Sequence, residues 1–405
     1  MMQDSEQHIE LFQEETTQIL NQKGIGGTGG EGRNLSVYLV VCCRDWSVSQ
    51  TKAPLYKVEV ALSNSDDPSL PLGAEPAGRV TLHRARNLET DMGGKTFVSL
   101  QSGWIVGIGG NPGSTIILDT KSGRMIRGPN LVARKWSPVV AVVGDRVYAL
   151  TSTPDYIQEP NFVPWFEVLD ISKPDVTETA EGVLSLADTF TWTPLPYPLC
   201  FPRRLTRTDF HMPPRITVTS SVVVEPYILI SVSRPYNSTY AFDTSSREWH
   251  GVEGEQLPFI GTAAPHGGGI FLAPSHKYGP KPYRIRVSTS GKGGAIELST
   301  TVIPVRNEEH EEINAGGARY VYLDREHFAL LSWQNDSGCY MSYDTKTDET
   351  YPRKLYLKLV TYQTGRCVLE GKTPEIVVSC QPEQAFRICS SPVFSDSPIA
   401  FALSV

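Results

Sequence analysis

The segment FVSLQSGWIVGI at residues 97–108, followed by STIILDTKSGRM at 114–125, contains the pattern that decides the fold. An apolar run, a tight turn and a second apolar run predict a β-hairpin, and the third apolar run ends at Asp119. An aspartate at that position predicts an Asx-turn, in which the carboxylate accepts backbone N–H groups about two residues further on. The segment therefore predicts three antiparallel strands joined by short turns.

The same pattern returns four times along the chain. The further hairpins are VVAVVGDRVYAL (139–150), TVTSSVVVEPYILISV (217–232), GTAAPHGGGIFLA (261–273) and RYVYLDREHFALLS (319–332). The third runs end at Asp170, Asp243 and Asp344, with Val287 in the corresponding place of the fourth copy. A weaker copy, NLSVYLVVCC (34–43) with PLYKVEV (54–60), precedes them. We expect each copy to be one small twisted sheet.

A small twisted sheet cannot bury both of its faces alone, but sheets stacked around an axis cover one another. The sequence therefore predicts an all-β protein, a β-propeller of about six blades at 34–405, with ring closure that joins strands from both ends of the chain. Seven blades are the alternative, because LYLKLVTY (355–362), EIVVSC (375–380) and the following AFRI complete the last blade or start another. Residues 1–33, which include the Gly-rich GIGGTGGEG at 24–32, are expected to form a flexible N-terminal arm.

Several motifs resemble those of kelch repeats. Gly109 and Gly110 follow a strand, Tyr148 and Phe271 supply the aromatic residue of a second strand, and Asp243 with Thr244 is followed by Trp249. The region from about 34 to 390 also resembles a kelch-like family expanded in grasses and described as a domain of unknown function. NLSVYLV and LYKVEV match the opening strands of that family. The resemblance implies a plant protein with a kelch-like propeller and brings no established activity.

Composition narrows the classes of partner. The chain has 37 basic and 44 acidic residues, a net charge of −7, so general binding to nucleic acid is not expected. The N-terminus lacks an export signal, and no apolar run reaches the roughly 20 residues that a bilayer requires. Seven cysteines without a CxxC pair predict reduced, mostly buried thiols and no zinc site. We expect a cytoplasmic or nuclear protein that does not enter a membrane.

The insertion at roughly 171–215 is the strongest candidate for a contact surface. Its second half, PLCFPRRLTRTDFHMPPR, concentrates four arginines, Arg203, Arg204, Arg207 and Arg215. Guanidinium groups suit carboxylates or phosphates, so these residues are predicted to bind a protein partner. A solvated loop is the alternative. Asp119, Asp170, Asp243, Asp344 and Trp249 are assigned structural roles in the blade turns.

No catalytic, cofactor or metal site is predicted. The GxGxxG at Gly24 to Gly29 lies in the linker without the preceding strand that a nucleotide site requires, and EEHEE at 308–312 is typical of an exposed loop. The expected function is that of a non-catalytic protein-interaction module. A small-molecule or metal-dependent propeller enzyme or specifier is one alternative. A ubiquitin-ligase adaptor whose F-box lies on another chain is the other.

Overall fold

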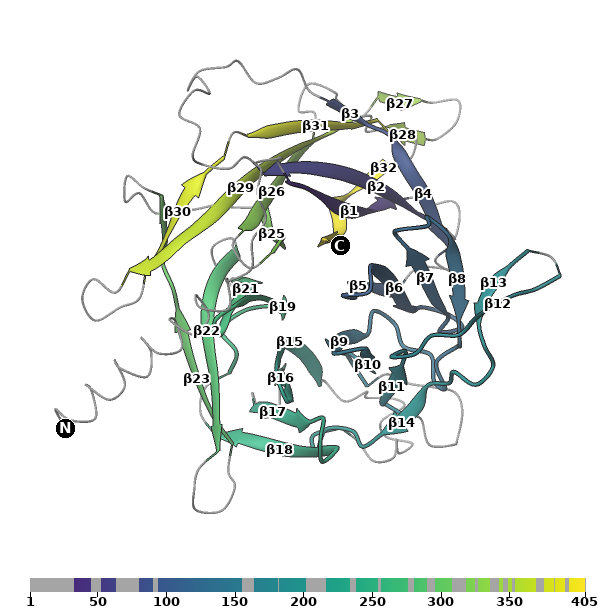
Figure 1. The fold of residues 1–405 in the computed structure, drawn as a ribbon, viewed down its shortest axis with the longest axis vertical. Coiled ribbons are helices and arrows are strands. Elements are labelled where there is room, and N and C mark those ends of the chain that lie inside the picture. Colours follow the sequence, from purple (N-terminus) through teal and green to yellow (C-terminus); the bar gives the residue numbers. More distant parts are fainter. Residues whose placement is uncertain are drawn as a thin grey trace, which may run out of the picture.

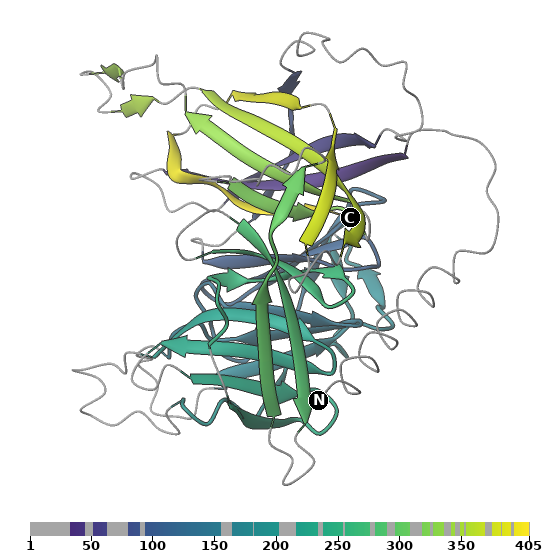
Figure 2. The same cartoon turned by 90° about the vertical axis from the view of Figure 1, so that its left-hand side faces the viewer.

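The computed structural model describes residues 33–44, 52–62, 80–89, 94–154, 164–180, 182–201, 216–233, 238–253, 256–275, 280–289, 296–307, 318–324, 327–335, 342–344, 349–351, 354–368, 375–381, 383–389 and 393–404. All 32 elements in these ranges are β-strands, which confirms the all-β prediction (Figures 1 and 2). A helix long and apolar enough to cross a membrane does not occur in these ranges.

The strands form six groups, which we number I to VI. Group I contains β1 (Arg33–Arg44), β2 (Lys52–Leu62), β4 (Arg84–Glu89) and β32 (Val393–Ser404). Group II contains β5 (Lys95–Ser99), β6 (Trp104–Gly109), β7 (Thr115–Asp119) and β8 (Met125–Gly128). Group III contains β9 (Val139–Val143), β10 (Arg146–Leu150), β11 (Phe166–Asp170) and β14 (Thr193–Leu195).

The second half of the chain supplies the other three groups. Group IV contains β15 (Thr217–Val224), β16 (Tyr227–Ser233), β17 (Ser238–Asp243) and β18 (Glu248–Glu253). Group V contains β20 (Ala264–Gly267), β21 (Ile270–Pro274), β22 (Pro280–Thr289) and β23 (Ile296–Val302). Group VI contains β25 (Ala318–Tyr322), β26 (His327–Asn335), β29 (Lys354–Val368), β30 (Glu375–Cys380) and β31 (Gln384–Cys389).

Seven short strands lie outside this scheme. Six of them are β3 (Val80–Leu82), β12 (Val176–Glu178), β13 (Leu184–Leu186), β19 (Gly261–Thr262), β24 (Val305–Asn307) and β27 (Ser342–Asp344), and the seventh is β28 (Glu349–Tyr351). Four of them, β3, β13, β19 and β24, extend neighbouring groups through parallel pairs. A further parallel pair, β18 with β23, joins groups IV and V into one nine-stranded sheet.

The five hairpins expected from the sequence are confirmed. In groups II to VI the first two strands pair antiparallel, as β5–β6, β9–β10, β15–β16, β20–β21 and β25–β26. The third run pairs with the second strand in groups II to V. The weaker first copy is also present, because β1 pairs with β2.

The third strand predicted for the fifth copy is wrong. Asp344 ends β27, which pairs only with β28 among the described strands, and Figure 2 shows this light-green pair apart from the larger sheets. The strand that pairs with β26 is β29, where apolar and polar residues alternate from Leu355 to Leu359. Such alternation buries one face of a strand, which the short run before Asp344 does not offer. The segments 355–362 and 375–380 therefore belong to the sheet of β25 and β26.

The six groups follow one another around a central region in chain order (Figure 1). The first strands β5, β9 and β15 contact each other in that order, and β15 pairs with β19, which contacts β21. The cycle is completed because β21 contacts β25, β25 contacts β32, and β32 contacts β5. Each group therefore has a neighbour on both sides.

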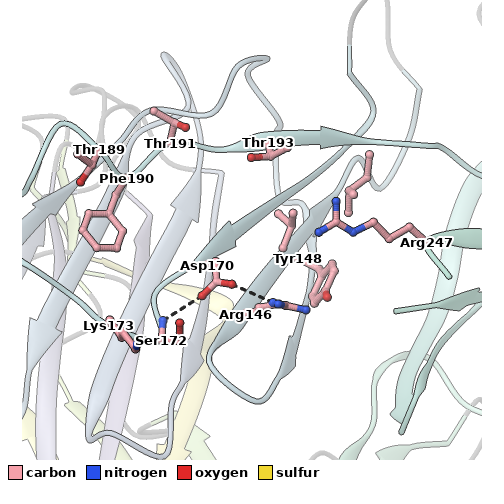
Figure 3. Close-up of a pocket in the computed structure, with 12 residues that line it drawn as sticks. Arg146, Tyr148, Asp170, Ser172, Lys173, Thr189, Phe190, Thr191, Thr193 and Arg247 are labelled. Atoms are coloured by element: carbon pink, nitrogen blue, oxygen red, sulfur yellow. Dashed lines mark hydrogen bonds and ion pairs between the residues drawn. The ribbon is translucent and has the colours of Figure 1, made fainter. Parts of the chain in front are cut away.

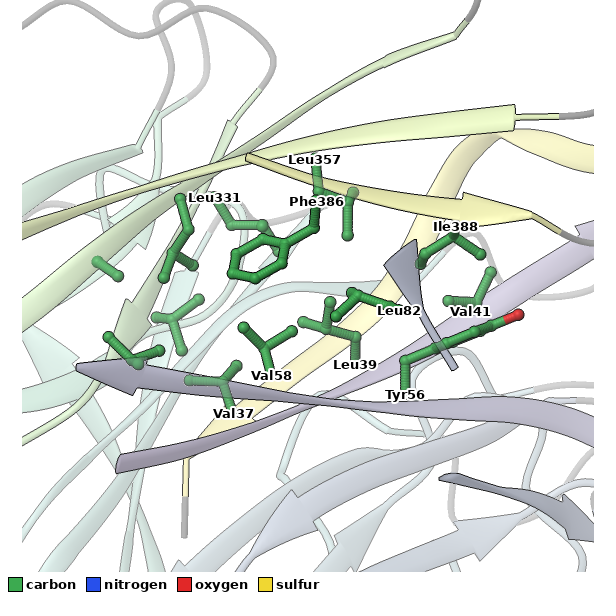
Figure 4. Packing of buried hydrophobic residues seen from close by; sticks show 14 of the residues in the cluster. Val37, Leu39, Val41, Tyr56, Val58, Leu82, Leu331, Leu357, Phe386 and Ile388 are labelled. Carbon is green, nitrogen blue, oxygen red and sulfur yellow. The ribbon is translucent and has the colours of Figure 1, made fainter. Parts of the chain in front are cut away.

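Six clusters of buried apolar side chains lie between consecutive groups, one for each pair of neighbours. Side chains on β1 alternate between two of them. Val37, Leu39 and Val41 pack toward group VI, as Figure 4 shows, whereas Tyr38 and Val40 pack toward group II. Successive side chains of a strand point to opposite faces of its sheet. A strand whose sheet is covered on both faces is therefore apolar throughout.

Strands from the two ends of the described chain pair with each other, as expected. β1 lies antiparallel to β32, with Val37 opposite Ser404 and Leu39 opposite Ala402. This pairing gives group I its inner strand and places it between groups VI and II.

Candidate functional site

The predicted turn aspartates occupy the ends of third strands. Asp119 accepts a hydrogen bond from the backbone N–H of Lys121 at 3.1 Å, and Asp170 accepts one from Ser172 at 3.1 Å. Asp243 accepts one from Ser245 at 2.7 Å. Each bond spans two residues, the spacing of an Asx-turn.

The predicted partner-binding arginines lie outside the described residues. Arg203, Arg204, Arg207 and Arg215 all fall within 202–215, and the acidic run at 308–312 is outside as well. The first half of the same insertion is folded: β12 and β13 form a hairpin that pairs with β8 of group II. The alternative of a solvated loop over 171–215 is therefore wrong for the parts of 171–201 that form β12, β13 and β14. Apolar Leu184 and Leu186 in β13 explain the difference, because they pack into the cluster between groups II and III.

The connection from β8 to β9 is a feature that the sequence reading missed. Between Pro129 and Pro138, burial alternates: Leu131, Ala133 and Lys135 are buried, whereas Val132, Arg134 and Trp136 are exposed. We call residues 129–138 the anchored loop. Its backbone forms several hydrogen bonds with the loops of group II. The N–H of Leu131 donates to the carbonyl of Gly113 at 2.9 Å, and the N–H of Ser137 donates to the carbonyl of Gly94 at 2.7 Å.

A buried ion pair anchors this loop to group III. The Lys135 ammonium contacts the Glu167 carboxylate, and both side chains are 0% exposed. The ammonium also donates to the carbonyl of Pro164 at 2.9 Å. Glu167 in turn accepts the backbone N–H of Val132 at 2.8 Å and of Ala133 at 3.2 Å.

Burial lowers the pKa of Lys135, while its attraction to Glu167 opposes that shift. A buried charge that loses its partner is strongly destabilising. The pair, with the bonds from the N–H groups of Val132 and Ala133 to Glu167, therefore ties the anchored loop to β11.

The outward side chains of the anchored loop include unusually exposed apolar groups. Val132 is 59% and Trp136 is 60% exposed. The Trp136 indole lies against Gly94, where a Cβ would come within 2.5 Å of its Cδ2. Arg134 lies between them in the sequence and is exposed. Tryptophan and arginine are enriched among residues that dominate protein–protein binding energies.

A pocket of about 430 Å³ lies at the other end of the strands, between groups III and IV (Figure 3). Its polar lining comes from the ends of β10 and β11, the segment before β14 and the β17–β18 turn. Three cations, Arg146, Lys173 and Arg247, line it together with one carboxylate, Asp170. Arg146 Nε donates to Asp170 Oδ2 at 2.9 Å.

The pocket carboxylate is already satisfied. Burial opposes ionisation of Asp170, but hydrogen bonds from Ser172 and Arg146 outweigh that effect and lower its pKa. Burial raises the pKa of Tyr148, and the neighbouring Arg146 and Arg247 oppose that rise. Both guanidinium groups lie near the Tyr148 ring (Figure 3).

The described ranges contain no group of three or more His, Cys, Asp or Glu side chains placed to hold a metal ion. Cys200 and Cys380 carry free thiols, the first half-buried and the second exposed.

Comparison with protein families finds a match over residues 35–384 to a family described as a protein of unknown function, DUF1668. The chain belongs to the DUF1668 family. Comparison with curated proteins finds no match. The region shared with the DUF1668 family includes both the anchored loop and the pocket.

One signal in the sequence could have identified the pocket. DTKSG at 119–123 aligns with DTSSR at 243–247, so an arginine replaces the glycine of an equivalent turn. The anchored loop offers no such signal, because Val132 and Trp136 are apolar but exposed and Lys135 is charged but buried.

Proposed function

We propose that the chain is a kelch-like β-propeller of six blades, the groups I to VI, and that it is a non-catalytic module that binds a protein partner. The propeller is supported by the cycle of contacts among the inner strands and by one apolar cluster between each pair of neighbouring groups. Stacking around an axis is the arrangement that covers both faces of every small sheet.

The observation that carries the binding function is the anchored loop. Val132, Arg134 and Trp136 project from a backbone that is fixed by the buried pair of Lys135 and Glu167. Holding a loop in its bound conformation removes part of the entropic cost of association. The exposed indole and guanidinium are therefore presented in advance to a partner.

Affinity capture with purified full-length protein tests this function. We expect the intact chain to retain a partner that the Arg134→Ala/Trp136→Ala variant loses, because removal of a central tryptophan costs about 2 kcal/mol or more of binding. Ile260→Ala serves as a control because Ile260 is also exposed, at 46%. Retention of the same proteins by all three chains would contradict the assignment.

A second variant separates the anchored loop from the contact predicted by sequence. Replacement of Arg203, Arg204 and Arg207 by alanine removes three positive charges from residues 203–215, the basic segment, and leaves the sequence of the anchored loop unchanged. Loss of the partner in this variant alone would place the contact on the basic segment.

A further inference from the structure

The β17–β18 turn of group IV carries a strained arginine in a position that glycine fills elsewhere. In both turns an aspartate carbonyl accepts the N–H of the residue four positions on: Asp119 O from Gly123 N and Asp243 O from Arg247 N, each at 2.8 Å. Gly123 has φ of 68° and Arg247 has φ of 60°. The left-handed conformation is natural for glycine and unfavourable for arginine.

Backbone strain of this kind persists where the side chain has a use that outweighs it. Arg247 lines the pocket between groups III and IV, whereas a Cβ at the equivalent Gly123 meets nothing within 4 Å. The arginine therefore supplies a cationic side chain to the pocket, which glycine at the equivalent position of the first turn could not do.

The charges in the pocket are unbalanced. Arg146 pairs with Asp170, which is the one carboxylate among the described lining residues, while Arg247 and Lys173 form no ion pair with any described residue. The described lining thus has three cations against one anion. Two guanidinium groups beside Tyr148 repel one another unless an anion lies between them.

The remaining lining supplies neutral hydrogen-bond donors. Thr189, Thr191 and Thr193 contribute hydroxyl groups along one segment of the lining, and Figure 3 shows Thr193 as the one drawn nearest to Arg247. Arginine pairs with phosphate through parallel N–H donors, and a phosphomonoester has a charge of about −1.5 to −2 at neutral pH. That charge matches the excess of two cations, which a single carboxylate would leave half compensated.

We propose that this pocket binds a phosphomonoester, with Arg247, Arg146 and Lys173 as its cationic ligands. The site lies at the opposite end of β9 and β10 from the anchored loop, so it does not depend on the protein-binding function proposed above.

The test uses isothermal titration of the full chain with four probes: inorganic phosphate, acetyl-Ala-Ala-phosphoserine-Ala-Ala-amide, and the same peptide with serine or aspartate in place of phosphoserine. We expect phosphate and the phosphopeptide to bind and the serine peptide not to bind. Aspartate binding as tight as phosphoserine binding would overturn the assignment to a phosphomonoester. Tighter binding of the phosphopeptide than of inorganic phosphate would identify a phosphorylated protein as the source of the phosphomonoester. Tighter binding of inorganic phosphate would instead indicate a small molecule.

The decisive variant is Arg247→Gly, which places glycine at the position that Gly123 occupies in the equivalent turn. This variant should keep or raise the melting temperature, because glycine relieves the backbone strain. It should also weaken phosphopeptide binding by about tenfold or more, because a charge-assisted hydrogen bond is lost. Lys173→Ala should weaken binding in the same direction. Arg124→Ala is the matched control, because Arg124 follows the equivalent turn but pairs with Glu178 outside the pocket. Unchanged affinity in Arg247→Gly, or equal loss in Arg124→Ala, would overturn the proposal.

Discussion

The indole Nε1 of Trp249 donates a hydrogen bond of 2.8 Å to the carbonyl oxygen of Pro196, which directly follows β14 of the preceding group. The same relationship joins groups II and III, where Trp192 Nε1 donates to the carbonyl of Pro129, directly after β8, at 3.2 Å. Each of these two successive interfaces therefore has a tryptophan-to-carbonyl hydrogen bond at the edge of its apolar cluster.

Trp249→Phe should lower the free energy of unfolding by about 2 kcal/mol. The variant removes the donor of a part-buried hydrogen bond and reduces the apolar volume between groups III and IV. Urea denaturation measures the loss, with exposed Trp136→Phe as the control that should change stability little. Equal stability of Trp249→Phe and the wild type would show that the contact is unimportant.

Glu167→Gln should destabilise the protein by about 3 kcal/mol, because it leaves the Lys135 ammonium buried without a counter-charge. The double variant Lys135→Met/Glu167→Leu should lose less unfolding free energy than the sum of the losses of its two single variants, Lys135→Met and Glu167→Leu. A double-mutant cycle by chemical denaturation measures this coupling. Additive losses would mean that the two side chains act independently.

Arg247→Gly should raise the free energy of unfolding by up to about 1 kcal/mol, because glycine adopts the observed φ of 60° without strain. The reverse exchange, Gly123→Arg, should lower it by about 1 kcal/mol. Thermal denaturation of the two variants checks the signs. A loss of stability in Arg247→Gly would indicate that the arginine holds the fold together.

Stability should fall as the pH decreases from about 6.5 to about 4, because burial lowers the pKa of His266 from 6.5 to about 4. Above pH 6.5 the imidazole is neutral in both states. Between the two values only the unfolded chain binds the proton, so unfolding is favoured, by about 3 kcal/mol in total. Asp324 opposes this shift and His327 adds to it, while the rings of Tyr322 and Phe328 pack against the imidazole.

Comparison of His266→Leu with the wild type isolates this contribution, since other acidic groups titrate in both chains. The variant should show a shallower decline of unfolding free energy across the same pH range. Identical slopes in the two proteins would show that His266 does not cause the pH dependence.

Much of the strand order could be predicted because the determining signals are local. The turn at Asp119 and the hairpin before it lie within one short segment, and the same signal located groups III and IV. Group V was located by its hairpin, because Val287 replaces the aspartate there. The pairing of β1 with β32 followed from the need to close a ring, which is a physical requirement and not a sequence motif.

The rest depended on contacts that a local pattern does not contain. Asp344 has the residues of a turn, yet β29 replaces its strand because Leu355, Leu357 and Leu359 bury a face. The pairing of Lys135 with Glu167 joins residues 32 apart, and neither side chain is distinctive in isolation. Arg247 could have been found only by comparing its turn with that of Gly123.

The closure of the ring is tested most directly by a disulfide between its two ends. Val37 and Ser404 are opposite one another in β1 and β32, within the distance that a disulfide spans. On oxidation, Val37→Cys/Ser404→Cys should form this bond, identified by peptide mapping, and gain about 2–4 kcal/mol of stability over its reduced form. If the two thiols instead remain separately reactive, or pair only with other cysteines of the chain, the two ends do not meet and the ring of six groups is contradicted.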